Sequence, residues 1–155
     1  MLIAAAPAIG AAVPAHAGVT FVPAKQLMAT IEQTREQSTG IALMNYLRTP
    51  GYSAAVVRRT TAGKAELHER VDDIWYVLDG GATLVTGGSL IDPHGTEAGE
   101  VRGSGVSHGT ERQIAKGDLI GIPAGTPHWV SRISGRELVY LVIKAKENAT
   151  QGARR

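Results

Sequence analysis

The chain contains no cysteine, and this absence excludes several kinds of site at once. A disulfide scaffold, a thiolate zinc site, an iron–sulfur cluster and a cysteine nucleophile all need the missing thiol. Aromatic residues are also few, with one Phe, two Trp and four Tyr. The formal net charge is only +2, and the basic residues are dispersed without interleaved aromatics. A surface that binds nucleic acid is therefore not indicated.

What the chain does contain indicates a β-rich domain. Its 155 residues fit one domain, and 43% hydrophobic residues beside 19% charged residues suffice for a packed core. Nineteen glycines and seven prolines predict many turns between short strands. The chain has no G-x-S-x-G elbow, and no glycine-rich segment opens a helix as a phosphate-binding loop does. Hydrolase and phosphate-loop sites of these types are therefore not indicated.

The first 17 residues differ in composition from the rest of the chain. Thirteen of them are apolar, eight of these are alanine, and the first charged residue is Lys25. The stretch ends in Ala15-His16-Ala17, an A-x-A pattern of the kind that signal peptidase cleaves. We therefore expect residues 1–17 to be a signal peptide and the protein to be secreted or periplasmic, although no basic residue precedes the apolar run. The alternative is a disordered arm. A membrane span is not expected, because prolines interrupt the run and a spanning helix needs roughly 20 apolar residues.

Residues 18–40 are expected to form an N-terminal arm and a helix. Pro23 suits the first turn of a helix, and Leu27, Met28 and Ile31 follow at the spacing of one helix face. Strands are expected from there on, as a sandwich or barrel over residues 41–145, followed by a basic tail over 146–155. The strand candidates are 41–47, 52–60, 64–68, 73–78, 82–86, 118–122, 128–133 and 137–143, with a short one in 99–103.

Three local patterns refine this expectation. Asp79-Gly80-Gly81 is typical of a hairpin turn, so the strands on either side of it are expected to pair. The segment 92–107 is expected to be the least regular part, apart from its one short strand. The polar stretch from Lys144 has no apolar periodicity, so the last strand is expected to end at Ile143 and the chain beyond it to fray.

Two segments carry a more specific pattern. The first, residues 66–80, reads ELHERVDDIWYVLDG, and the second, residues 117–128, reads GDLIGIPAGTPH. Together they resemble the two sequence motifs of the cupin family. The matching positions are His68, Asp73 and Gly80 in the first segment, and Gly117, Pro123, Gly125 and His128 in the second. The resemblance covers about residues 54–143. It implies an all-β, single-domain cupin double-stranded β-helix, a jelly-roll barrel, with one N-terminal α-helix.

The resemblance also implies a metal centre, here with two altered ligands. Cupins commonly hold one divalent metal with three histidines and a glutamate, whereas this chain has Glu66 at the first histidine and Asp73 at the glutamate. Residues 66 and 68 are two apart on a strand, so their side chains face the same side. The resemblance implies His68, Asp73 and His128 as the ligands of one divalent first-row metal, with Glu66 as a fourth ligand or a general base. Imidazole and carboxylate suit Fe, Mn, Ni or Zn, and the share of oxygen ligands slightly favours Mn or Fe.

These residues also have a plainer interpretation. The acidic residues and His68 can be ordinary charged groups at a solvated strand end, and His128 can be a turn residue that caps a strand. A metal-free barrel that keeps the motif only as scaffold is then the alternative to a metal centre.

Four further residues are candidates for the substrate pocket. Trp75 and Val77 have the parity of Asp73, so they are expected to point inwards and form an apolar wall. Glu100 and Arg102 alternate on the short strand, either as a substrate clamp or as a salt-bridged turn.

The function expected from this resemblance is the binding of a small molecule, anionic or hydroxylated, next to the metal. An enzyme of the dioxygenase, isomerase, epimerase or lyase type is implied, and the residues do not select one of them. Two alternatives stay open: a small-ligand-binding protein without catalysis, and an interaction module that uses the glycine-rich segment. The resemblance also makes a homodimer an expectation.

Overall fold

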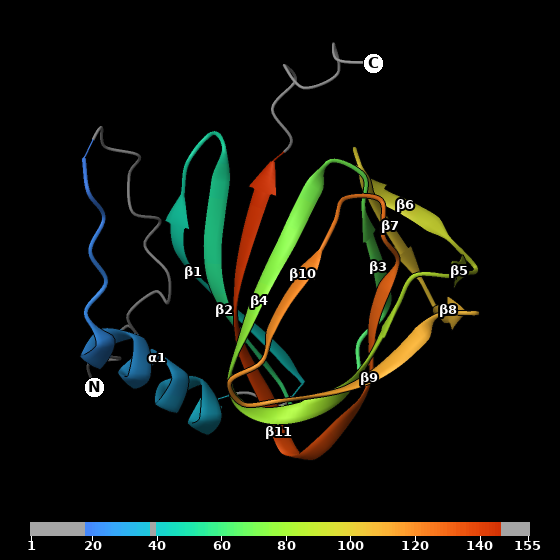
Figure 1. Cartoon of the computed structure of the whole chain (residues 1–155). Helices are drawn as coiled ribbons and strands as arrows, with labels where there is room; N and C mark the ends of the chain where they lie inside the picture. The colour runs from blue at the N-terminus through green and yellow to red at the C-terminus, as the bar shows by residue number, and fades with distance from the viewer. Residues whose placement is uncertain (1–17, 38–39, 147–155) are drawn as a thin grey trace, which may run out of the picture.

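One helix and a series of short and long strands make up the described part of the chain, residues 18–37 and 40–146 of the computed structural model (Figure 1). The helix is α1 (Ala24–Gln37). The strands are β1 (Ile41–Arg48), β2 (Tyr52–Arg59), β3 (Ala65–His68), β4 (Val71–Thr86), β5 (Ser89–Ile91), β6 (His94–Glu97), β7 (Glu100–Gly103), β8 (Gly105–Ser107), β9 (Thr110–Ala115), β10 (Leu119–Ile122) and β11 (His128–Lys146). The predicted signal peptide and the basic tail beyond residue 146 lie outside the described residues.

Two long strands, β4 and β11, run through the whole barrel as an antiparallel ribbon. Their register extends from His128 opposite Thr86 to Lys146 opposite Val71. On its other side β11 pairs with β2 and, at one residue pair, with β3, whereas β4 pairs with β9 and β10. The sheet continues from β2 to β1 and from β3 to β7 and β6. This curled antiparallel sheet is a jelly roll, so the predicted all-β fold class is confirmed.

The prediction of a hairpin at Asp79-Gly80-Gly81 is wrong. β4 continues without a turn, because both of its halves pair with β11 instead of with each other. Gly80 creases the strand: its φ is +71°, and a Cβ at this position would lie 1.8 Å from the Glu137 carbonyl oxygen. Only glycine fits there. The predicted strands 128–133 and 137–143 likewise join in the single strand β11.

The last strand also extends further than predicted. The expectation that the chain frays from Lys144 is wrong, since β11 runs to Lys146 and Lys144 lies opposite Ser53 of β2 and Asp73 of β4. In the sequence pattern, an inward-facing polar residue looks like the end of a strand. Here the partner of that residue is a carboxylate on another strand, which the local pattern does not show. The segment 92–107, expected to be irregular, contains β6 and β8 beside the predicted strand β7.

The barrel interior is filled by inward-facing apolar side chains from β2, β4 and β11 and from the shorter strands β9 and β10. Trp75 and Tyr140 stack at its centre, with ring centroids 4.3 Å apart. Each large apolar side chain buried in this way contributes about 1.5–3 kcal/mol. The core residues are Ala55, Val57, Trp75, Val77, Ala82, Leu84, Ile114, Ile122, Val130, Leu138, Tyr140 and Val142.

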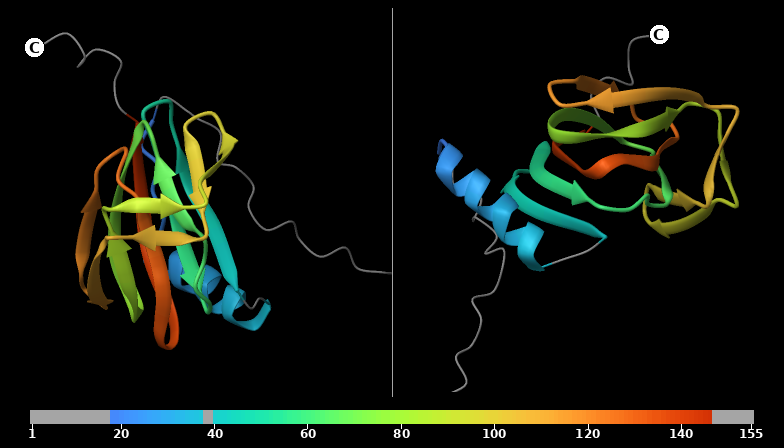
Figure 2. Two further views of the ribbon diagram at one scale, coloured as in Figure 1. Left: turned by 90° about the vertical axis from the view of Figure 1, so that its right-hand side faces the viewer. Right: turned by 90° about the horizontal axis from the view of Figure 1, so that it is seen from below.

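Helix α1 lies outside the barrel, alongside β1 and β2 (Figure 2). It begins where the Pro23 carbonyl accepts hydrogen bonds from the next turn, as a proline at the start of a helix permits. Ile31 packs on Met44, Val56 and Val139 in a second buried cluster. The helix is also held by ion pairs, in which Arg35 reaches Glu137 at 2.7 Å and Asp79 at 2.8 Å.

Candidate metal centre

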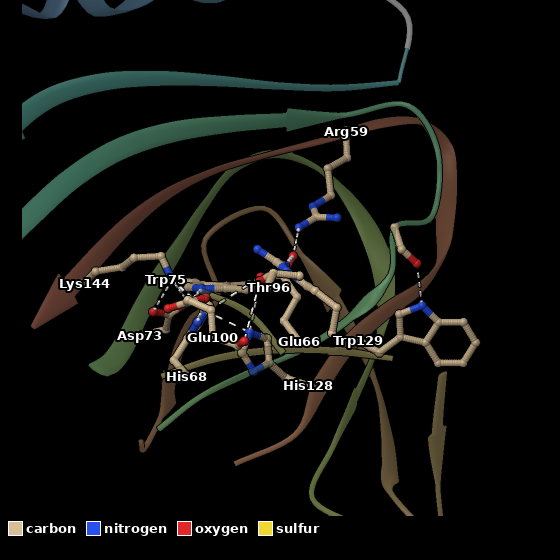
Figure 3. A network of polar contacts seen from close by, with 12 residues as sticks. Arg59, Glu66, His68, Asp73, Trp75, Thr96, Glu100, His128, Trp129 and Lys144 are labelled. Carbon is tan, nitrogen blue, oxygen red and sulfur yellow. Dashed lines mark hydrogen bonds and ion pairs between the residues drawn. The ribbon is translucent and has the colours of Figure 1, made fainter. Parts of the chain in front are cut away.

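Three strands bring the candidate ligands to one end of the barrel. β3 carries Glu66 and His68, the first half of β4 carries Asp73, and β11 begins at His128 (Figure 3). The turn before β11 is fixed by Gly125, which has a φ of +75° and donates its backbone N–H to the His68 carbonyl at 2.7 Å. The second motif therefore places His128 next to β3, where it lies opposite Glu66 in the β3–β11 register.

Glu66, His68 and His128 form a compact set of ligand atoms. One ligand atom from each lies within 4.8 Å of the others. The Glu66 Oε2 atom lies 3.6 Å from His68 Nε2 and 4.0 Å from His128 Nε2. These distances are too long for a hydrogen bond, but they let both rings and the carboxylate face one point. Glu66 and His68 therefore point to the same side of β3, as expected.

His128 supplies the clearest sign that this set suits a cation. Its Nδ1 donates to the Thr126 carbonyl at 3.1 Å, so in the neutral ring Nε2 carries the lone pair. This Nε2 atom is buried and has no hydrogen-bond partner, a property that it shares only with the Tyr46 hydroxyl among the described residues. Burial lowers the pKa of His128 and so favours the neutral ring. An unpaired, buried lone pair beside a carboxylate fits a metal ion.

The second histidine is oriented by an acidic partner. His68 Nδ1 donates to Glu100 Oε2 at 2.6 Å, and His68 lies opposite Glu100 in the β3–β7 register. A carboxylate on the far nitrogen of a metal-binding histidine fixes the ring and its tautomer. Glu100, proposed from sequence as a pocket residue, lines the cavity and at the same time holds His68.

Glu66 is held by two arginines on one of its oxygens. Its Oε1 contacts Arg102, which lies opposite it on β7, and Arg59 Nη2 at 3.5 Å. Burial raises the pKa of the Glu66 carboxyl, but the charges of Arg102 and Arg59 outweigh this effect and hold it below its ordinary value. The carboxylate is therefore ionised, with Oε2 left facing the two histidines.

Asp73 is buried, with 2% of its surface exposed, and is already engaged. Its oxygens accept hydrogen bonds from Lys144 Nζ at 2.8 and 3.1 Å, and Oδ2 accepts one from Trp75 Nε1 at 3.2 Å. Oδ2 also lies 3.6 Å from His68 Nε2 and 3.9 Å from His128 Nε2. The structure thus brings all four predicted ligands together, and adds a lysine that the motifs did not indicate.

Lys144 and Arg59 are the functional candidates that sequence reasoning missed. Lys144 follows Tyr140 and Val142 at the period of two that points side chains into the barrel, and this continuation is the signal that was available. Arg59 stands at the end of β2 with the parity of the inward-facing Val57. Its Nε donates to the Tyr140 hydroxyl at 3.1 Å, and burial raises the pKa of Tyr140 to about 12.

A cavity of about 410 Å³ opens beside these residues. Trp75 forms part of its wall, as predicted from parity, while Val77 lies deeper, in the core, and is not among the lining residues. Arg102 lines the cavity on the β7 side. Charged groups of both signs surround the space: Arg59, Arg102 and Lys144 against Glu66, Asp73, Glu97 and Glu100. A space of this size and lining suits a small polar molecule.

Comparison with known proteins identifies the fold. No family model and no curated protein matches the sequence. Among solved structures, the Cnp3 cupin domain of Schizosaccharomyces pombe matches 71% of this chain and 67% of its own at 11% identity and a TM-score of 0.52. KdgF from Halomonas sp. matches 72% and 85% at 18% identity and 0.51. A predicted oxalate decarboxylase from Thermotoga maritima matches 69% and 81% at 14% identity and 0.51.

These similarities show the fold: the chain folds as cupins do. The resemblance seen in the two motifs is thus confirmed at the level of the fold. Among the described residues, no helix is long and apolar enough to cross a membrane.

Proposed function

We propose that the barrel binds one divalent first-row metal through Glu66, His68 and His128, and that a small anionic or hydroxylated molecule binds beside it in the cavity. The observation that carries this proposal is the buried Nε2 atom of His128, which has a lone pair and no partner and faces a carboxylate and a second imidazole. Two histidines and one carboxylate are a set that Fe, Mn, Ni and Zn accept, and such a set leaves positions open for a ligand.

In this proposal Glu66 is a metal ligand and not a general base. Its lowered pKa makes it a poor proton acceptor near neutral pH, because Arg102 and Arg59 stabilise the charged form. The same two arginines hold Oε1 and leave Oε2 for the metal. Glu100 and the Thr126 carbonyl each hold the Nδ1–H of one histidine, so in both neutral rings Nε2 carries the lone pair.

The cavity argues for a small oxygen-rich ligand. Lys144 and Arg102 present partly exposed cationic groups, with 33% and 30% of their side chains accessible, and can hold a carboxylate or hydroxyl groups. Trp75 provides an apolar wall. A bound metal supplies Lewis-acid polarisation of a ligand oxygen. The oxalate decarboxylase neighbour, named for a small dicarboxylate, supports this choice of ligand class.

The test is elemental analysis of the full chain, purified without chelators, beside the double variant His68→Ala/His128→Ala. We expect about one equivalent of a first-row metal in the wild type and none in the double variant, because a single carboxylate does not hold the ion. His94→Ala is the matched control, since His94 lies on β6 and its Nδ1 bonds the Asp92 carbonyl at 3.3 Å. A folded wild-type protein that takes up no metal, even when metal is added, would refute the proposal.

A further inference from the structure

Lys144 already makes the contact that a metal would need. Its ammonium group lies 2.8 Å from His68 Nε2, and 2.8 and 3.1 Å from the two oxygens of Asp73 (Figure 3). An ammonium group only donates hydrogen bonds, so His68 Nε2 accepts this one with its lone pair. Because His68 Nδ1 donates to Glu100, that lone pair is the only ligand atom that the neutral ring offers.

The position of Lys144 follows from the β4–β11 ribbon. Lys144 and Asp73 lie directly opposite each other in the register, and both side chains point into the barrel. Asp73 is 2% exposed, whereas the Lys144 side chain is 33% exposed, so the ammonium group lies between a buried carboxylate and the open cavity. The lysine therefore has an acceptor that holds it at the site and a path by which it can leave.

A metal and this ammonium group cannot both use His68. A metal–imidazole bond is about 2.0–2.1 Å long and occupies the lone pair that now accepts from Lys144. On the basis of the metal site proposed above, we infer that Lys144 is an internal competitor of the metal: its charge takes the place of the ion, and metal binding displaces it from His68. Asp73 is then the counter-ion of Lys144 in both states and not a metal ligand.

Two consequences distinguish this arrangement from an ordinary surface ion pair. The metal-free protein keeps its buried carboxylate paired, so the site is stable without the ion. The metal, in turn, binds more weakly than its ligands alone would allow, because each binding event breaks the bond between Lys144 and His68 and places a second positive charge near the ammonium group.

The experiment is a titration of the full chain with Co²⁺ and Zn²⁺ against a chelator of known affinity, for the wild type, Lys144→Met, Lys144→Arg and Lys146→Met. Met removes the ammonium group and keeps the stem, and we expect Lys144→Met to bind metal about tenfold more tightly, the factor of a typical charge-assisted hydrogen bond. Lys144→Arg keeps the charge and the donors and should remain near the wild type. Lys146→Met removes the same charge from an exposed position two residues further along β11 and is the matched control.

The second measurement is thermal unfolding of the same four proteins, with excess chelator and with excess metal. In chelator, Lys144→Met should melt at a lower temperature than Lys146→Met, because Asp73 is left buried without its cation. Added metal should raise the melting temperature of Lys144→Met more than that of the wild type, as expected for tighter binding.

The outcomes separate this inference from the proposed metal site. Wild-type protein that binds metal while Lys144→Met binds no more tightly than Lys146→Met would overturn the inference and leave the metal site standing. Metal binding by Lys144→Met alone would refute the proposed metal binding of the wild type and would still support the competition, with the lysine excluding the ion. If none of the four folded proteins binds metal, both the proposed function and the inference are wrong.

Discussion

Glu137 is a buried carboxylate and Glu66 a half-buried one, and each contacts two arginines, yet their surroundings differ in one respect. Both oxygens of Glu137 are used, since Oε1 accepts from Arg35 Nε and Oε2 accepts from Arg58 Nε, each at 2.7 Å. In Glu66 the arginines hold only Oε1, and Oε2 faces two histidine nitrogens at 3.6 and 4.0 Å. In the first cluster both carboxylate oxygens are paired with arginines, and in the second only one is.

This difference distinguishes an ion cluster that is saturated within the protein from one that can still bind a ligand. A saturated ion cluster, such as the one that ties α1 to β11 through Glu137, has no capacity left for a ligand. A cluster with an unpaired buried acceptor, such as His128 Nε2, lowers the stability of the protein unless a ligand binds to that acceptor.

The largest effect is expected from Glu137→Ala. Removing this carboxylate breaks two ion pairs, one with Arg35 and one with Arg58, whose side chain is 4% exposed, so the free energy of unfolding should fall by about 3 kcal/mol or more. Urea denaturation in the presence of chelator measures the change. Glu66→Ala is the counterpart and should cost clearly less stability, because the cavity lets water reach Arg102. Equal losses for the two variants would erase the distinction.

Glu66→Gln should act on metal binding instead. An amide offers a neutral and weaker ligand oxygen, so metal affinity is expected to drop by about a hundredfold or more, with a small change in unfolding free energy. Glu137→Gln provides the control, and its metal affinity should match that of the wild type. Chelator-competition titrations measure both, and an unchanged affinity of Glu66→Gln would remove this residue from the ligand set.

A more moderate effect is expected from Glu100→Gln. The amide still reaches His68 Nδ1 but loses its charge, and second-layer changes of this kind typically cost 10- to 100-fold in metal affinity, here about tenfold. Glu97→Gln is the matched control, because Glu97 also lines the cavity and lies opposite Glu100 in the β6–β7 register. If both variants weaken the metal equally, Glu100 acts only through the general charge of the cavity.

The smallest effect is a pH dependence of stability that comes from Glu137. Burial raises the pKa of its carboxyl, but the hydrogen bonds and charges of Arg58 and Arg35 lower it below the ordinary value of 4.5. Because the folded-state pKa is the lower one, the stabilisation is complete above pH 4.5 and is lost as the pH falls through the folded-state pKa. Urea denaturation at a series of acidic pH values should therefore show a shallower decline for Glu137→Gln than for the wild type.

Much of the fold and of the candidate site could be predicted from local sequence. The G-x5-P-x-G-x2-H spacing placed His128 after a fixed turn, and the period of two placed Glu66 and His68 on one side of a strand. The hairpin at Gly80 could not be distinguished from a crease, because a glycine with positive φ serves both and the choice depends on pairing with distant β11. Lys144 was missed for the same reason, since its partner Asp73 is 71 residues away.

The short pairing between β3 and β11 has a consequence for the order of folding. In the sheet register these two strands are paired at one position, Glu66 opposite His128. Contacts between such distant parts of a chain form slowly, since the loop between them must first be closed. The two histidines therefore meet only when the barrel closes. A refolding experiment that follows a probe at His128 should report closure as an event separate from the earlier formation of the β1–β2 hairpin.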